Sequence, residues 1–188
     1  MSNFHIIVLT APSGAGKTTI AHRVLQTLPE MQFSVSATTR SAREDEEHGE
    51  DYYFLSEQAF RERIAASDLL EYEEVYPGQF YGTLRPEVEK KAEHGPVLLD
   101  IDVRGAVNVK EIYGDEALVL FIAPPSLEAL HDRLTDRGTE SSDSLRERLE
   151  RASMEMDYAE RCDAVVVNDE LDAAVEETLG HIRRFLNS

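Results

Sequence analysis

This sequence is poor in cysteine, in tryptophan and in long apolar segments. Cys162 is the only cysteine, and there is no tryptophan. A single thiol cannot close a disulfide within the chain, which favours a cytoplasmic protein. Its neighbours Arg161 and Asp163 supply no base or metal-ligand set, so we interpret Cys162 as a buried structural residue. No apolar run approaches the ~20 residues that span a bilayer, and no signal-sequence pattern follows the N-terminus, so we expect a soluble protein that is not exported and does not bind membranes.

Basic residues are also scarce. Lysine and arginine together number 19 against 37 aspartates and glutamates, which gives a formal net charge of −18. A surface of this sign repels a phosphodiester backbone and argues against nucleic acid as a partner. Only four of the bases are lysines, and two interpretations stay open: adaptation to a salt-rich cytoplasm, or an ordinary acidic enzyme. A polyanionic substrate of such a protein requires arginines concentrated at its binding site.

The 188 residues suffice for one hydrophobic core, and no repeat, low-complexity tract or linker divides them. Short apolar segments alternate with helical patterns, which predicts an α/β fold with a parallel five-stranded sheet covered by helices. The expected strands are 4–10, 33–36, 97–101, 118–123 and 164–167, and the expected helices after the first include 57–66, 86–94, 105–113, 126–133 and 171–186. Ser144 and Glu147 form a capping-box pattern for one more long helix.

Two segments depart from this alternation. Residues 37–90 contain short strands, aromatic residues and a hairpin signal at Pro77-Gly78, which predicts a small mixed α/β subdomain inserted over the sheet. Residues 134–149 are polar, rich in arginine and interrupted by glycine and serine, which is typical of a helical lid. We therefore expect a core of residues 1–36 and 91–188 that carries the lid, and an insertion of residues 37–90.

The most informative segment is 11–19, Ala-Pro-Ser-Gly-Ala-Gly-Lys-Thr-Thr, between a strand pattern and a helix pattern. This is the context of a phosphate-binding loop, whose backbone N–H groups and helix N-terminus attract phosphate. Lys17 is expected to reach the β- and γ-phosphates, and Thr18 to hold Mg²⁺. The strict pattern has glycine where this chain has Ala11, so the turn must be one that alanine can adopt. The alternative is a tight strand-to-helix turn that binds nothing.

Other polar residues suit a second phosphate and a metal. Arg40 and Arg43 lie three apart in a hydroxyl-rich stretch, and guanidinium groups donate paired hydrogen bonds to phosphate. Solvated surface arginines are the alternative. Asp100 and Asp102 end an apolar strand two residues apart, so both point to one face, at the edge where open α/β sheets bind ligands.

These motifs are accompanied by several others along the chain. The chain has Ser-Val-Ser-Ala-Thr-Thr-Arg-x-x-Arg at 34–43, Gly49-Glu50-Asp51-Tyr52-x-Phe54, Leu70-Glu71-Tyr72, Tyr81-Gly82-Thr83, Leu99-Asp100-Ile101-Asp102, Ile122-Ala123-Pro124-Pro125-Ser126, Arg137-Gly138-Thr139 and Val167-Asn168-Asp169. Together with the phosphate loop they resemble the guanylate kinase family over almost the whole chain.

The resemblance implies reversible phosphoryl transfer from ATP to GMP, and to dGMP, with Mg²⁺, by a monomer or homodimer. It implies GMP contacts at Ser36, Arg40, Arg43, Tyr52, Glu71, Tyr81, Thr83 and Asp102, with Glu71 accepting from guanine N1–H and the amino group. It implies ATP contacts at Ala11, Pro12, Ser13, Gly14, Ala15, Gly16, Lys17, Thr18, Thr19, Arg133, Arg137 and Asn168, the last near adenine. Thr18 and, through water, Asp100 match the Mg²⁺ site. The family's catalytic cations correspond to Lys17, Arg40, Arg43, Arg137 and Arg148.

Alternatives accompany this interpretation. A kinase of phosphorylated sugars needs no guanine-reading carboxylate such as Glu71. Some guanylate-kinase-like domains bind peptides instead, and these typically have a degraded phosphate loop, unlike this chain. Arg148 could simply form an i, i+4 ion pair on an exposed helix. Ala42 and Asp45 depart from the family's proline and glycine, from which we expect altered loop stiffness rather than lost chemistry.

Overall fold

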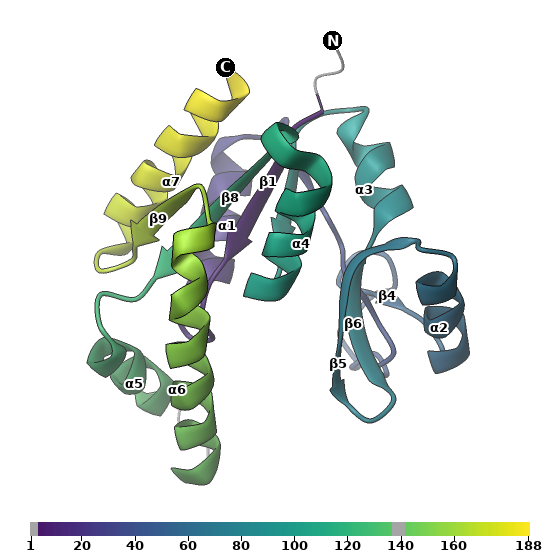
Figure 1. Ribbon diagram of the computed structural model, residues 1–188, viewed down its shortest axis with the longest axis horizontal. Helices are drawn as coiled ribbons and strands as arrows, with labels where there is room; N and C mark the ends of the chain where they lie inside the picture. Colours follow the sequence, from purple (N-terminus) through teal and green to yellow (C-terminus); the bar gives the residue numbers. More distant parts are fainter. Residues whose placement is uncertain (1–3, 137–141) are drawn as a thin grey trace.

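The computed structural model describes residues 4–136 and 142–188. Its centre is a five-stranded parallel sheet in the order β2–β7–β1–β8–β9 (Figure 1). The strands are β1 (Ile6–Thr10), β2 (Gln32–Phe33), β7 (Val97–Asp100), β8 (Ala117–Ala123) and β9 (Ala164–Val167). Since β1 lies between β7 and β8, the chain leaves it at the point where the strand order reverses, which is where such sheets bind ligands.

Helices bury both faces of this sheet. The residues of β1 alternate: Ile7 and Leu9 belong to the core under α1 and α7, whereas Ile6 and Val8 belong to the core under α3 and α4. These helices are α1 (Lys17–Thr27), α3 (Arg85–Ala92), α4 (Val103–Tyr113) and α7 (Leu171–Leu186). A strand buried on both faces is apolar throughout, and this is why β1 and β8 read as unbroken apolar runs.

A second, four-stranded sheet lies beside the first, in the order β4–β3–β6–β5. Its elements are β3 (Ala37–Thr38), β4 (Tyr53–Phe54), α2 (Glu57–Ala65), β5 (Leu69–Tyr76) and β6 (Gln79–Leu84). The rings of Phe60 and Phe80 stack at 5.3 Å within a separate small core. The strands β5 and β6 form an antiparallel hairpin that turns at Gly78, whose φ is +78°. This sheet gives the insertion its own hydrophobic support.

The remaining helices lie on the other side of the phosphate loop. They are α5 (Leu127–Asp136) and α6 (Ser142–Met156), followed by a 3₁₀ turn, η2 (Asp157–Arg161); a further turn, η1 (Gly114–Glu116), precedes β8. Leu130, Leu134 and Ala152 form the contact between α5 and α6. In Figure 1 these two helices and the β5–β6 hairpin extend from the same end of the central sheet.

The predicted fold class is confirmed, and all five strands of the parallel sheet occur in place. Several boundaries differ: the strand predicted from residue 4 begins at Ile6, the helix predicted from 105 begins at Val103, and the helix predicted to end at 133 ends at Asp136. The strand predicted at 33–36 ends at Phe33, because Ser34 makes one last backbone bond to Leu98 and the chain then enters the second sheet. The capping box predicted at Ser144 does not start the helix, since α6 begins at Ser142.

Candidate active site

The phosphate loop runs from the end of β1 to the first residue of α1. Gly14 and Gly16 have φ values of +93° and +92°, a region that other residues rarely adopt. A β-carbon on Gly14 would lie 2.8 Å from Leu134 Cδ2, and one on Gly16 would collide with the amide of Asn168. The loop therefore requires glycine at both positions. Ala11 is buried and is not among the described residues with positive φ, which explains why alanine serves there.

Lys17 and Thr18 both reach the carboxylate of Asp100. Lys17 Nζ forms an ion pair with Oδ1 and donates a hydrogen bond to the carbonyl of Ile101 at 2.8 Å. The Thr18 hydroxyl donates to Asp100 Oδ2 at 3.0 Å. The end of β7 thus holds the loop lysine over the concavity where phosphate oxygens bind.

The same oxygens fit a magnesium ion. The hydroxyl of Thr18 and the carboxylate of Asp100 are hard oxygen donors, the kind that Mg²⁺ prefers. Within the described residues, no group of three or more His, Cys, Asp or Glu could hold a metal ion. Two protein oxygens suit Mg²⁺, which keeps several waters and takes its other ligands from phosphates.

Asp100 and Asp102 have different neighbours despite sharing one face. Asp100 faces the loop, whereas Asp102 caps α4 by accepting a hydrogen bond from Gly105 N at 2.7 Å. Asp102 also lies beside Glu71 and Glu73 of β5 and raises the pKa of both carboxyls. The two aspartates therefore have different hydrogen-bond partners, although both line the cavity beside Glu71.

Glu71 lines a second cavity, of about 220 Å³, and Thr83 lies behind it. They are opposite each other in the β5–β6 hairpin, and the fully buried Thr83 hydroxyl donates to Glu71 Oε1 at 2.6 Å. Burial raises the pKa of Glu71 to about 7, and the Thr83 hydrogen bond opposes that rise. Ser36, Tyr52 and Tyr81 also line this cavity. A carboxylate held here can accept two adjacent N–H donors of a ligand.

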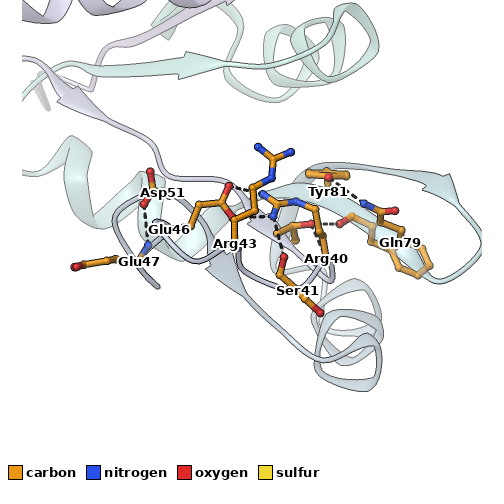
Figure 2. A network of polar contacts seen from close by, with 10 residues as sticks. Arg40, Ser41, Arg43, Glu46, Glu47, Asp51, Gln79 and Tyr81 are labelled. Carbon is orange, nitrogen blue, oxygen red and sulfur yellow. Dashed lines mark hydrogen bonds and ion pairs between the residues drawn. The ribbon is translucent and has the colours of Figure 1, made fainter. Parts of the chain in front are cut away.

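Arg40 is held by a carboxylate that the sequence analysis missed. Both oxygens of Glu46 accept from the Arg40 guanidinium, at 2.7 and 2.8 Å (Figure 2). Glu46 Oε2 also accepts from the backbone N–H of Arg43 at 2.8 Å. These bonds lower the pKa of Glu46 to about 2 and raise that of Arg40. In the sequence, Glu46 is an acidic residue three positions after Arg43, and nothing in the pattern distinguishes it from the many other acidic residues of this chain.

Two tyrosines, Tyr52 and Tyr81, lie beside Arg40. Its Cζ lies 5.2 Å from the centre of the Tyr52 ring, and Tyr52 meets Tyr81 edge to face at 6.0 Å. Gln79 donates to the Tyr81 hydroxyl at 3.1 Å, as Figure 2 shows. Arg40, Tyr52 and Tyr81 thus meet in one region, with Arg40 supported on two sides, whereas Arg43 is exposed and joins the network through its backbone N–H.

The phosphate loop itself borders a larger cavity of about 650 Å³. Among the residues predicted to bind ATP, this cavity is lined by Ala11, Pro12, Ser13, Gly14, Gly16, Lys17, Thr18 and Thr19, and it is also lined by Asp102 and Arg148. Ala15, within the loop, is fully buried. Arg137 lies outside the described residues.

Asn168 and Arg133 stand behind the loop. The buried Asn168 amide donates to the carbonyl of Ala15 at 2.7 Å, and Arg133 Nη2 donates to the carbonyl of Asn168 at 2.9 Å. The Asn168 amide N–H is therefore used to hold the loop. This is a contact that the sequence did not suggest.

Comparison with known proteins agrees with this geometry. The family model described as guanylate kinase matches residues 3–187. The chain belongs to the guanylate kinase family. A guanylate kinase of Salinibacter ruber is 70% identical over 188 residues, covering 100% of both chains. One from Bacteroides thetaiotaomicron is 47% identical over 183 residues, covering 97% of this chain and 90% of its own.

Solved structures extend the likeness to the fold. The crystal structure of guanylate kinase from Anaplasma phagocytophilum has a TM-score of 0.78 at 30% identity and covers 100% of this chain and 89% of its own. A gluconokinase from Sinorhizobium meliloti, at 15% identity and a TM-score of 0.54, shares the fold alone. Membership of the guanylate kinase family makes this chain a nucleoside monophosphate kinase. None of the described helices is long and apolar enough to cross a membrane.

Proposed function

We propose that this kinase transfers the γ-phosphoryl group of Mg·ATP to GMP, and also to dGMP, giving ADP and the nucleoside diphosphate. The observation that carries the proposal is the hydrogen-bonded Glu71–Thr83 pair, whose carboxylate lines a cavity together with Tyr52 and Tyr81, beside Arg40. Guanine presents N1–H and an amino group side by side, and a carboxylate accepts both. Adenine has an unprotonated N1 there and would leave the carboxylate unpaired, which costs several kcal/mol.

In this proposal residues 37–90 bind GMP, residues 1–36 and 91–188 bind ATP, and residues 134–149 form the lid. An oxygen of the GMP phosphate attacks the γ-phosphorus, and the bond to the β–γ bridging oxygen breaks to release ADP. The acceptor is already an anion, so no general base is required. Arg40 and Arg43 hold the acceptor phosphate in line, and catalysis consists of positioning and charge stabilisation.

Lys17 supplies positive charge at the transferring group. Its ion pair with Asp100 directs Nζ toward the loop, from where it can reach phosphate oxygens. Thr18 and Asp100 would hold Mg²⁺, the aspartate through water, and the ion supplies neutralisation of the β- and γ-phosphates when bound. Arg133, Arg137 and Arg148 complete the cationic side of the ATP site. The single cysteine supports a cytoplasmic place of action within the same proposal.

The test is an ADP-release assay with Mg·ATP and each of GMP, dGMP, AMP, CMP and UMP, repeated with Glu71→Gln. Turnover with the guanine nucleotides alone, lost or relaxed in the variant, is the expected result. A folded protein that binds GMP without turnover would instead indicate a binding module. Turnover with another nucleotide would contradict the assignment of Glu71.

A further inference from the structure

Arg151 lies where the two cavities meet. It is on α6, one turn after Arg148, and it lines the phosphate-loop cavity and also the cavity of Glu71. Among the described residues, both cavities are lined by Lys17, Val75, Asp102 and Arg151. Arg151 and Lys17 are the two cations of this set, and the proposed function assigns no task to Arg151.

The side chain of Arg151 joins two parts of the molecule that are far apart in sequence. Its Nη2 lies 3.4 Å from Glu73 Oε2, on strand β5 of the insertion. Its Nε donates to Glu155 Oε1 at 2.9 Å, within α6 itself. Glu155 is buried, and its other side-chain oxygen has no partner within the described chain. Glu155 thus fixes the Arg151 side chain on α6, while the end of the Arg151 guanidinium contacts Glu73 on strand β5.

Charge makes this contact important for the shape of the site. Glu73 lies against Asp102, close to Glu71, so three carboxyl groups crowd one end of the cavity. Carboxylates that lie this close to each other repel, and the protein as a whole is strongly acidic. Arg151 is the cation that faces Glu73 and Asp102 from α6. Its removal leaves less positive charge against these carboxyl groups and favours separation of β5 from the helix.

We propose that Arg151 and Glu73 form a bridge that positions the GMP-binding insertion against α6 and thereby couples the GMP site to the ATP site. The assignment of a nucleotide to each site rests on the proposed function; the bridge itself rests on the contacts above. Coupling between two sites is reciprocal, so a contact that joins their walls changes the affinity of each ligand in the presence of the other by one common factor.

The first experiment measures binding of GMP by calorimetry with and without saturating Mg·ADP, which occupies the ATP site and cannot react with GMP. For the natural sequence we expect Mg·ADP to strengthen GMP binding. Arg151→Gln and Glu73→Gln should each reduce that enhancement about fivefold, and the double variant should lose no more than either one. An unchanged enhancement, or losses that add in the double variant, would overturn the bridge.

Arg23→Gln is the matched control. Arg23 pairs with Asp172 at 3.0 Å and is 47% exposed, against 50% for Arg151, but its pair joins α1 and α7 away from both cavities. It should leave the enhancement unchanged. A melting curve for each variant separates loss of coupling from loss of the fold.

A second experiment does not depend on any nucleotide. Spin labels at Ala65 on α2 and Met154 on α6, in a Cys162→Ser background, report the separation of the insertion from the helix. Arg151→Gln should lengthen and broaden that distance, and an unchanged distribution would overturn the bridge. If the natural sequence does not bind GMP, the proposed substrate is wrong, and this measurement decides the bridge by itself.

Discussion

The absence of a side chain at Gly105 makes room for Glu71. A β-carbon at position 105 would lie 2.7 Å from Glu71 Cγ and 3.0 Å from Glu71 Oε2. Gly105 is in the first turn of α4, where its N–H donates to the capping carboxylate of Asp102. The helix that follows β7 thus approaches strand β5 closely enough to set the position of the Glu71 carboxylate.

This contact predicts that Gly105→Ala impairs GMP binding specifically. The methyl group must displace the carboxylate, and small displacements of a positioning group lower rates strongly. We expect KM for GMP to rise about tenfold while KM for ATP stays nearly constant, measured by steady-state kinetics. The control is Gly180→Ala in α7, where the nearest atom, Arg184 Nη1, is 3.5 Å away. That variant should keep both KM values and gain up to about 1 kcal/mol of stability. Equal KM values in the two variants would refute the steric argument.

The raised pKa of Glu71 predicts that GMP recognition weakens in acid. The carboxyl titrates at about 7 in the free protein, and only its charged form accepts two guanine donors. kcat/KM for GMP should therefore fall as pH decreases below 7, measured from about pH 5.5 to 8.5. GMP itself ionises with a pKa of about 6, and Glu71→Gln isolates that contribution. Thr83→Val removes the hydrogen bond that favours the charged form, so it should move the midpoint to higher pH. A profile identical to that of Glu71→Gln would contradict this account.

The sign of the linked stability effect is the reverse of the usual one for an acid. Because the pKa of Glu71 is higher in the folded protein than its ordinary value of 4.5, the folded state binds this proton more tightly. The contribution of Glu71 to the free energy of unfolding should therefore decrease as pH rises from about 4.5 toward 7. Chemical unfolding of the natural sequence and of Glu71→Gln across that interval measures the difference.

The bidentate pair of Arg40 and Glu46 predicts that Glu46 positions the phosphate clamp. Glu46→Gln weakens the fork and also the bond to the Arg43 backbone, so both arginines lose their fixed geometry. We expect KM for GMP to rise about tenfold. The exposed neighbour Glu47 gives the control Glu47→Gln, which should have no effect. A lower KM in Glu46→Gln would show the opposite role, in which Glu46 competes with phosphate for Arg40.

The sequence was sufficient for the fold because β1, β7, β8 and β9 consist mostly of apolar residues and the phosphate-loop motif is local. Lys17 and Thr18 are adjacent in the chain, so their shared approach to one site follows from the strand–loop–helix pattern. The second sheet lies where the alternation of strand and helix patterns is interrupted, and Pro77-Gly78 indicated the hairpin of β5 and β6.

The contacts that tune the site could not be predicted in the same way. Glu46, Glu73 and Arg151 are ordinary members of a charge-rich sequence, and only the folded chain distinguishes them from solvated residues. The strand predicted at 33–36 was wrong at its C-terminal end for a related reason. Its last residues satisfy the β pattern, but the chain must leave the central sheet there to enter the insertion.

The contact between Asn168 and the phosphate loop leads to a prediction that separates two roles for this residue. Its amide donates to the buried carbonyl of Ala15, and Asn168→Ala leaves that acceptor without its partner, at about 1–3 kcal/mol of folding stability. A loosened loop should also raise KM for ATP several-fold, with the preference for ATP over GTP unchanged. If Asn168 instead recognises adenine, the variant would lose that preference and keep its stability. Unfolding curves and kinetics with both nucleotides decide between these outcomes. The exposed neighbour Asp169, as Asp169→Ala, should alter neither measurement, because its side chain lies outside the packed region behind the loop.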